Sequence, residues 1–444
     1  MSGAGMFRAL AVYNFRVWFF GALVSSLGGW MQTTAMSWVV LTELTHGNAS
    51  AMGLTTALQF APALILIPVT GRVVDRFDRR TLLFVTESLL GTIALTIGIL
   101  LILNVMTLPL MLCCAVVAGT AMAFENPVRQ AFVADLVAGE FTVNAVSLSS
   151  VQFNMARLAG PALAGVLIAV VGSGWVFVLN AATFLVLIVA LAVMRTEELL
   201  PRHRDASSAN MHAALTYLRR RSDLILLFSI VFVSSAFAVN FAVYAAAMAV
   251  HFHEPAWGFG LLTSCYAVGS LTGAIFVARQ RTVALRRIVA FTFVVAAAVG
   301  FSALMPNFWV YAAVCALCGY AIVTQLANAN AYMQTHTDPA IRGRALVIYL
   351  AFFTGGTPFG APLLGWAADA WGPRSAVALV GAAALASALV GLAWLVARRR
   401  PRRSERSRLV RRVDARYAIG ALRPRRPREE ASTGHRLRDD GGPA

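Results

Sequence analysis

The sequence predicts an all-α integral membrane protein with twelve transmembrane helices in two six-helix pseudo-symmetric bundles and with both termini cytoplasmic. Three observations predict this fold class. The 444-residue chain is 59% hydrophobic and only 13% charged, whereas soluble domains are nearer half apolar and a quarter charged. The apolar residues gather in twelve stretches of membrane-spanning length. The basic residues lie almost entirely between these stretches, and their placement indicates how the chain is threaded.

The twelve apolar stretches are each close to the ~20 residues that a helix needs to cross the hydrocarbon core. They must be helical, because backbone groups find no water to bond inside a bilayer. The predicted spans cover residues 17–41, 51–71, 82–103, 108–128, 144–171, 174–194, 224–250, 257–278, 288–305, 309–334, 345–371 and 374–397.

Arginine placement predicts the orientation. All 37 basic residues are arginines, and 35 of them face the cytoplasm when the N-terminus is placed inside. The exceptions are Arg157, within the fifth span, and Arg374, on the outer side. We therefore expect a multi-pass protein of the cell (inner) membrane. Anionic lipid of the inner leaflet accounts for the +17 net charge, so we expect no nucleic-acid partner.

The longest internal connection divides the spans six and six. We predict an N-terminal six-helix bundle over 1–194, a cytoplasmic central loop over 195–222, a C-terminal six-helix bundle over 223–397 and a disordered basic cytoplasmic tail over 398–444. The tail holds 16 of the arginines and cannot bury a core.

The two predicted bundles also resemble one another in sequence at an offset of roughly 200 residues. Two such repeats are typical of transporters that bind the substrate between the repeats. The matching segments are 126–130 with 330–334, 160–165 with 360–365, and 71–81 with 278–288.

The stretch GRVVDRFDRRT at 71–81 lies between the second and third spans and resembles the signature loop of the Major Facilitator Superfamily. The matching positions are Gly71, Asp75, Arg76, Arg79 and Arg80. Asp78 stands where the signature more often has glycine.

Four further stretches resemble the branch that contains enterobactin exporters and macrolide-type efflux proteins, which are drug:proton antiporters. They are 28–38, 126–137, 154–165 and 342–344. The resemblance implies a secondary transporter that works by alternating access, with a small-molecule substrate and protons as the coupling ion.

The charged turn at 71–81 has two interpretations. Its arginines could serve only as positive-inside anchors. Asp75 is not needed for anchoring, and it could form a cytoplasmic latch with Arg129 that holds one state of the transport cycle. Asp75→Asn should then slow transport and leave expression intact.

Ionisable residues deep in a span are functional candidates by default. Glu125 is the only acid that we place deep in a span, and Arg157 is the only base there. The two could pair, either as a fixed ion pair or with Glu125 as a proton-coupling site.

The fifth span carries an antiporter-like helix-packing motif, Gly160, Pro161 and Gly165, where small residues allow close helix contact. Polar side chains in other spans could line a substrate cavity or hydrogen-bond between helices. These cavity candidates are Gln32, Gln59, Asn154, Asn240, Gln325 and Asn328.

No nucleotide-binding motif and no convincing metal cluster occurs in the sequence, so we expect no enzyme activity, no cofactor and no metal. The predicted function is proton-coupled export of drugs, siderophores or other amphipathic molecules, by a protein that we expect to be a monomer. The alternatives are a proton-coupled importer of a small metabolite and a polytopic sensor or scaffold without flux.

Overall fold

The structure is a computed structural model, and it describes residues 7–200, 211–280, 282–338 and 341–399. The chain divides into one unit over Met1–Leu392 and a second over Ala393–Ala444. The description below concerns the first unit. Most of the predicted tail, residues 400–444, lies outside the described residues.

Helices occupy each of the predicted spans, because apolar stretches of this length satisfy their backbone groups internally. The seventh predicted span is split into α9, a π-helical turn η5 and α10. The long helices are α1 Tyr13–Trp38, α2 Ala49–Ile65, α4 Arg79–Ile102, α5 Leu108–Leu136, α6 Gly139–Val171, α7 Ser173–Val193, α9 Ser222–Val233, η5 Ser234–Ala238, α10 Phe241–His251, α11 Ala256–Ala278, α12 Leu285–Ser302, α13 Phe308–His336, α14 Arg342–Trp371 and α15 Pro373–Arg399.

The number of spans is supported in part. Among the described residues, ten helices are long and apolar enough to cross a membrane. The bent pair of α2 and α3 (Ile67–Arg76) would make an eleventh. The 26-residue α1 is long enough at about 1.5 Å per residue, but it is not among these helices. A helical membrane fold is therefore confirmed, while the count of twelve stays a prediction.

Two connections contain more helix than the sequence predicts. The charged turn at 71–81 is largely helical: α3 runs to Arg76, and α4 begins at Arg79. Asp78 caps α4, since its carboxylate accepts hydrogen bonds from the Thr81 backbone N–H (2.7 Å) and hydroxyl (2.9 Å). The central loop contains the short helix α8, Met211–Arg220.

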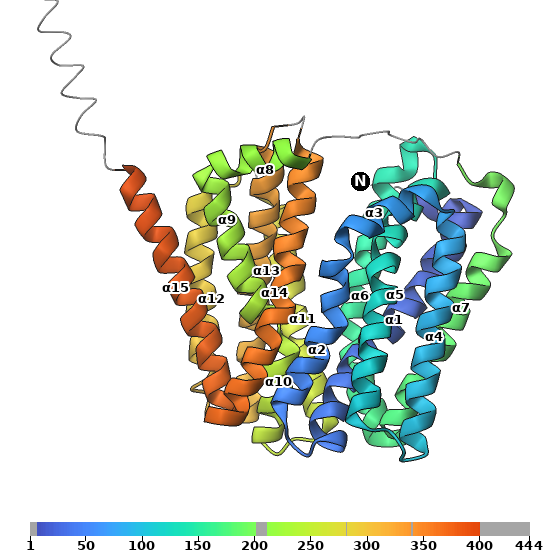
Figure 1. The fold of residues 1–444 in the computed structure, drawn as a ribbon, viewed down its shortest axis with the longest axis horizontal. Helices are drawn as coiled ribbons and strands as arrows, with labels where there is room; N and C mark the ends of the chain where they lie inside the picture. Colours follow the sequence, from blue (N-terminus) through green and yellow to red (C-terminus); the bar gives the residue numbers. More distant parts are fainter. Residues whose placement is uncertain (1–6, 201–210, 281, 339–340, 400–444) are drawn as a thin grey trace, which may run out of the picture. The chain divides into compact units, whose positions relative to one another are not determined.

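The repeat seen in the sequence has a backbone counterpart. Gly172 separates α6 from α7 and Gly372 separates α14 from α15, both with φ of +88°. This left-handed conformation favours glycine. The first helix set, α1–α7, and the second helix set, α9–α15, lie on opposite sides of Figure 1. Their contacts run mainly through α2 with α14 and α6 with α11.

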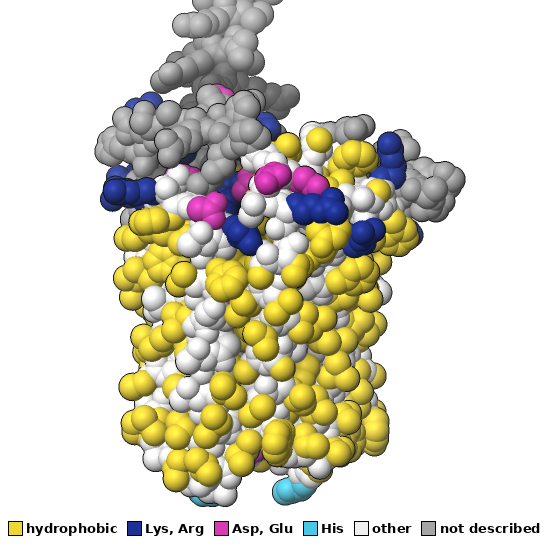
Figure 2. Space-filling model, turned by 90° about the vertical axis from the view of Figure 1, so that its right-hand side faces the viewer, with side chains coloured by type: hydrophobic (Ala, Val, Ile, Leu, Met, Phe, Trp, Pro, Cys, Tyr) yellow, Lys and Arg dark blue, Asp and Glu magenta, His cyan; other side chains and the backbone are white. Residues whose placement is uncertain are grey.

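Charged and hydrophobic side chains are separated along the length of the helices. Figure 2 shows hydrophobic side chains over most of the face viewed, with arginine and acidic side chains gathered at one end. Histidine appears at the opposite end. The charged end is the one that holds α3 and α8 in Figure 1. This is the pattern expected of a membrane protein whose basic connections share one side.

Candidate functional site

A buried cluster of charges joins two helices of the first helix set, α4 and α5. Arg129 on α5 contacts two carboxylates, Glu87 on α4 (Nη2 to Oε1, 2.7 Å) and Glu125 one turn earlier on α5 (Nε to Oε1, 2.5 Å). The side chain of Glu87 is fully buried, and those of Glu125 and Arg129 are 9% and 17% exposed. We call Glu87, Glu125 and Arg129 the charge cluster.

Hydroxyl groups of α1 complete the coordination of the guanidinium. Arg129 donates from Nη2 to Ser25 Oγ (2.7 Å) and from Nη1 to Ser26 Oγ (3.0 Å). Ser25 Oγ in turn donates to Glu87 Oε2 (3.2 Å). Gln152 of α6 donates to Ser26 Oγ (2.9 Å) and to the Ala22 carbonyl (2.8 Å). The cluster therefore connects α1, α4, α5 and α6.

The formal charge of this cluster is unbalanced. Two carboxylates share one guanidinium, so the cluster carries one net negative charge when both acids are ionised. Burial penalises an uncompensated charge, and binding a single proton would neutralise the group.

The second helix set contains a comparable but neutral contact. Ser234 of η5 donates to Gln325 Oε1 (3.0 Å), and Gln325 Nε2 donates to Thr292 Oγ1 of α12 (2.8 Å). In chain order, these elements occupy the places in the second set that α1, α4 and α5 occupy in the first. The titratable acids of the charge cluster lie in the first set.

The ion pair expected between Glu125 and Arg157 is not the pair that the structure contains. Glu125 binds Arg129 on its own helix, whereas Arg157 lies over the rings of Trp30 (5.6 Å) and Tyr266 (5.9 Å). The expectation that Glu125 is the only deep acid was wrong as well, since Glu87 is fully buried.

Sequence signals for these contacts existed. Glu125 and Arg129 have the i,i+4 spacing of a helical ion pair. Glu87 lies eight residues beyond the start of α4, although only five beyond the start of the predicted span. The earlier start of the helix places Glu87 deeper than its position in the apolar stretch indicates.

Among the described residues, no ion pair joins Asp75 to Arg129, the two residues expected to form the cytoplasmic latch. Gly71, Asp75 and Arg76 are exposed on α3, while Arg129 is engaged in the charge cluster.

The last two arginines of the signature stretch tie the start of α4 to neighbouring helices. Arg79 binds Asp135 of α5 (2.6 Å), and Arg80 donates to the Leu191 carbonyl of α7 (2.8 Å). This packing role was not expected.

Three cavity candidates hydrogen-bond or pack between helices. Gln32 accepts a hydrogen bond from Asn180 of α7 (2.5 Å), and both side chains are buried. Gln59 contacts the sulfur of Met122 (3.8 Å). Gln325 belongs to the neutral contact described above. The interhelical alternative therefore describes these three side chains.

The other three candidates bond within their own helical segment. Asn154 donates to the Ser150 carbonyl (2.8 Å) and is partly exposed. Asn240 donates to the Ala236 carbonyl (2.6 Å), and Asn328 to the Thr324 carbonyl (2.8 Å). Of the six candidates, Asn154 is the partly exposed one.

The antiporter-like motif packs α6 against both helix sets. A Cβ at Gly160 would lie 2.6 Å from Trp30 Cβ of α1, and one at Gly165 would lie 2.8 Å from the Ala256 carbonyl oxygen of α11. Pro161 contributes its carbonyl to the same crossing, 2.7 Å from a Cβ placed at Gly260. Only glycine allows these backbones to approach so closely.

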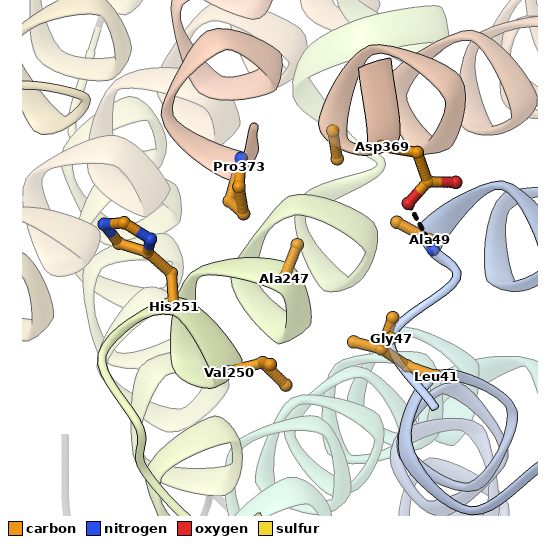
Figure 3. A pocket seen from close by; sticks show the side chains of 9 residues that line it. Leu41, Gly47, Ala49, Ala247, Val250, His251, Asp369 and Pro373 are labelled. Atoms are coloured by element: carbon orange, nitrogen blue, oxygen red, sulfur yellow. Dashed lines mark hydrogen bonds between the residues drawn. The ribbon is translucent and has the colours of Figure 1, made fainter. Parts of the chain in front are cut away.

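A carboxylate that we did not single out joins the two helix sets at the end opposite the charged turns. Asp369 of α14 accepts hydrogen bonds from the backbone N–H groups of Ala49 and Ser50 (both 2.8 Å) and from the Ser50 hydroxyl (2.5 Å). A negative charge stabilises a helix N-terminus, and these groups begin α2. A cavity of about 270 Å³ adjoins this contact, lined by α10 and the connection before α2; Figure 3 shows Asp369 turned toward Ala49 at its edge.

The fold and the buried ionic cluster define a polytopic α-helical membrane protein with a titratable group in its interior. The family model described as transmembrane secretion effector matches residues 4–411. The chain therefore belongs to this family of Major Facilitator Superfamily transporters.

Sequence identity to individual relatives is low. The chain is 30% identical to the staphyloferrin A transporter of Staphylococcus aureus over 38% of this chain and 43% of that protein. It is 28% identical to an uncharacterized MFS-type transporter of Bacillus subtilis over 44% of this chain and 47% of that protein. These two matches span less than half the length of the relatives. The multidrug efflux pump Tap of Mycobacterium tuberculosis matches at 24% identity over 80% of this chain and 86% of the pump.

Solved structures show the same fold. The nucleoside transporter NupG superposes with a TM-score of 0.66 at 12% identity, covering 86% of this chain and 98% of that one. A D-xylose-proton symporter superposes with a TM-score of 0.64 at 14% identity, covering 84% and 97%. At this identity the likeness concerns the arrangement of helices.

Proposed function

We propose that this protein is a secondary active transporter of the cytoplasmic (inner) membrane that exports drugs, siderophores or other amphipathic small molecules in exchange for protons. The observation that carries the proposal is the charge cluster, in which one arginine serves two buried carboxylates. Inside a membrane, a cluster that becomes neutral when it binds one proton can couple proton binding to the transport cycle.

Glu125 is the acid that we assign to proton exchange. Glu87 is fully buried and also accepts a hydrogen bond from Ser25, whereas the side chain of Glu125 retains 9% exposure. Arg129 can remain paired with Glu87 while Glu125 gains or loses its proton. The protonated and unprotonated clusters then differ in charge, which is the difference that a transport cycle needs to favour one state over the other.

The contacts between the helix sets support alternating access. Two contacts join the sets at the end away from the charged turns. Asp369 accepts hydrogen bonds from Ala49 and Ser50, and Gly165 packs closely against Ala256. With the charged turns in the cytoplasm, this is the outer end. We assign the structure to a state closed on the outside, in which the latch of Asp75 is open. The outward-open state would break the Asp369 contact and engage Asp75.

One relative supports export, and a second supports a siderophore as substrate. The multidrug efflux pump is matched over most of its length, and the staphyloferrin A transporter provides a siderophore precedent over part of its length. Small molecules and protons are therefore the proposed partners, and lipid of the anionic leaflet is the proposed partner of the basic tail.

The proposal is tested by flux through inverted membrane vesicles with Glu125→Gln. Glutamine resembles the protonated acid and cannot release a proton, so accumulation against a gradient should fall by at least about tenfold, while downhill exchange continues. Glu43→Gln is the matched control, because Glu43 also accepts a hydrogen bond (from Ser173, 2.7 Å) but lies outside the cluster. Unchanged accumulation in Glu125→Gln would overturn the role assigned to this acid.

A further inference from the structure

Arg157 is an intramembrane cation that the charge cluster does not use. It lies in the middle of α6 and is partly exposed. The ion pairs among the described residues bring their carboxylates to other arginines and none to Arg157. A guanidinium at this depth is costly without a partner of opposite charge, so its presence needs a reason beyond packing.

Aromatic rings from both helix sets flank this guanidinium. Its Cζ lies 5.6 Å from the ring centre of Trp30 on α1 and 5.9 Å from that of Tyr266 on α11. Both distances fall within cation–π range. Phe153, one helical turn before Arg157, is 48% exposed and meets Trp30 edge to face at 5.8 Å. The Tyr266 hydroxyl is also a hydrogen-bond partner of Arg157. A guanidinium has five N–H donors, so this contact and the rings leave donors for a further acceptor.

A polar stripe leads along α6 to this position. Ser147, Ser150 and Asn154 precede Arg157 at helical spacing, so the four residues share one face. The serines are exposed, and their hydroxyl protons are given to backbone carbonyls of the preceding turn (2.7 and 2.9 Å). The stripe thus places polar groups next to apolar rings, and such a surface suits an amphipathic molecule.

We infer that Arg157 anchors the anionic group of the transported molecule, and that the substrate class is amphipathic organic anions with an aromatic or other flat apolar body. A carboxylate or phenolate would take the fork of guanidinium donors, and the apolar body would pack on Trp30 and Phe153. Since Tyr266 belongs to the second helix set, a molecule bound at Arg157 contacts both sets. Its binding therefore changes the relative stability of states that differ in how the two sets are arranged. This inference rests on the proposed transport function and specifies its substrate.

The test uses fluorescein and rhodamine 123, dyes that share a xanthene ring system but carry opposite charge. Binding of each dye to the purified full-length protein is followed by fluorescence polarisation. Wild-type protein should bind fluorescein, and Arg157→Gln should weaken that binding by about 10- to 100-fold, the range for loss of a charge-assisted contact. Arg157→Lys should retain part of the affinity, because it keeps the charge without the fork.

Two controls keep the test specific. Arg16→Gln removes another arginine that lies over an aromatic ring in the same helix set (Tyr13, 5.9 Å), and it should leave fluorescein binding unchanged. Rhodamine 123 carries a positive charge, so the wild type should bind it more weakly than fluorescein, and Arg157→Gln should not weaken that binding further. An unchanged unfolding temperature in detergent shows that the variant is folded.

Several results would overturn the inference: no fluorescein binding by the wild type, equal binding by Arg157→Gln, or an equal loss of both dyes. A separate flux measurement in vesicles distinguishes the two proposals. Arg157-dependent binding of fluorescein without any flux would contradict the transport function and leave the anion site standing.

Discussion

At the scale of single residues, the charge cluster illustrates how a membrane protein keeps ionised groups in its interior. Arg129 is held by two carboxylates and two hydroxyls from three helices. Breaking such a group by removing one partner is far more costly than replacing it as a whole, because the remaining charges stay buried.

Arg129→Met should therefore destabilise the protein by about 3–5 kcal/mol, measured as thermal or denaturant unfolding in detergent. Adding Glu87→Gln and Glu125→Gln to this variant should recover much of the loss, since no buried charge then remains unpaired. Arg76→Met, at an exposed position of α3, is the control and should change stability little. A triple variant no more stable than Arg129→Met would contradict the electrostatic account.

The same scale shows what the sequence could and could not predict of the site. The depth of Glu125 and Arg157 was evident from the apolar residues around them. The i,i+4 spacing of Glu125 and Arg129 was a signal for their pairing within one helix. The neighbours of Arg157, which are rings of α1 and α11, depend on how each helix is rotated about its axis, and hydropathy does not encode this rotation. Asp369 lies near the end of the predicted span 345–371, and its function as a cap of α2 arises only from contact between the helix sets.

At the scale of helices, hydropathy predicted the elements well because the bilayer requires each span to be long, apolar and helical. Interruptions were missed. Pro62 and Pro68 flank the turn between α2 and α3, whereas the π-helical turn η5 interrupts an apolar stretch without a change in composition. The glycines are more informative, since close backbone contact leaves no space for a side chain at Gly165.

Gly165→Val tests whether the crossing of α6 and α11 closes the outer end. The added side chain would collide with the Ala256 carbonyl, since even a Cβ would lie only 2.8 Å from its oxygen. We expect flux to fall by about tenfold or more through loss of the outward-closed state, with expression retained. A Cβ at Gly29 would meet nothing within 4 Å, so Gly29→Val is the matched control. Ser50→Cys is added to each variant, and labelling of this cysteine by a thiol reagent from the outside is measured. Labelling should rise in Gly165→Val alone, and equal labelling in both variants would contradict the assignment.

At the scale of the whole molecule, the duplicated sequence, the matching glycines at 172 and 372, and the family match describe one architecture. The two helix sets differ in one interior contact: the cluster of Arg129 in the first set contains ionisable side chains, whereas the contact of Ser234, Gln325 and Thr292 in the second set is neutral. The second set also has a buried carboxylate, Asp223, which pairs with Arg221 at the start of α9. In the proposed cycle, proton exchange therefore belongs to the first set, while the substrate contacts both sets at Arg157 and Tyr266.

The central claim is that outward movement of substrate is exchanged for protons. It is tested most directly by following the pH gradient across inverted vesicles while amphipathic compounds are added one at a time. The account predicts that a transported compound collapses part of the gradient in vesicles with the wild-type protein and not in vesicles with Glu125→Gln. A compound that is carried by the wild type without any change in the gradient would contradict it.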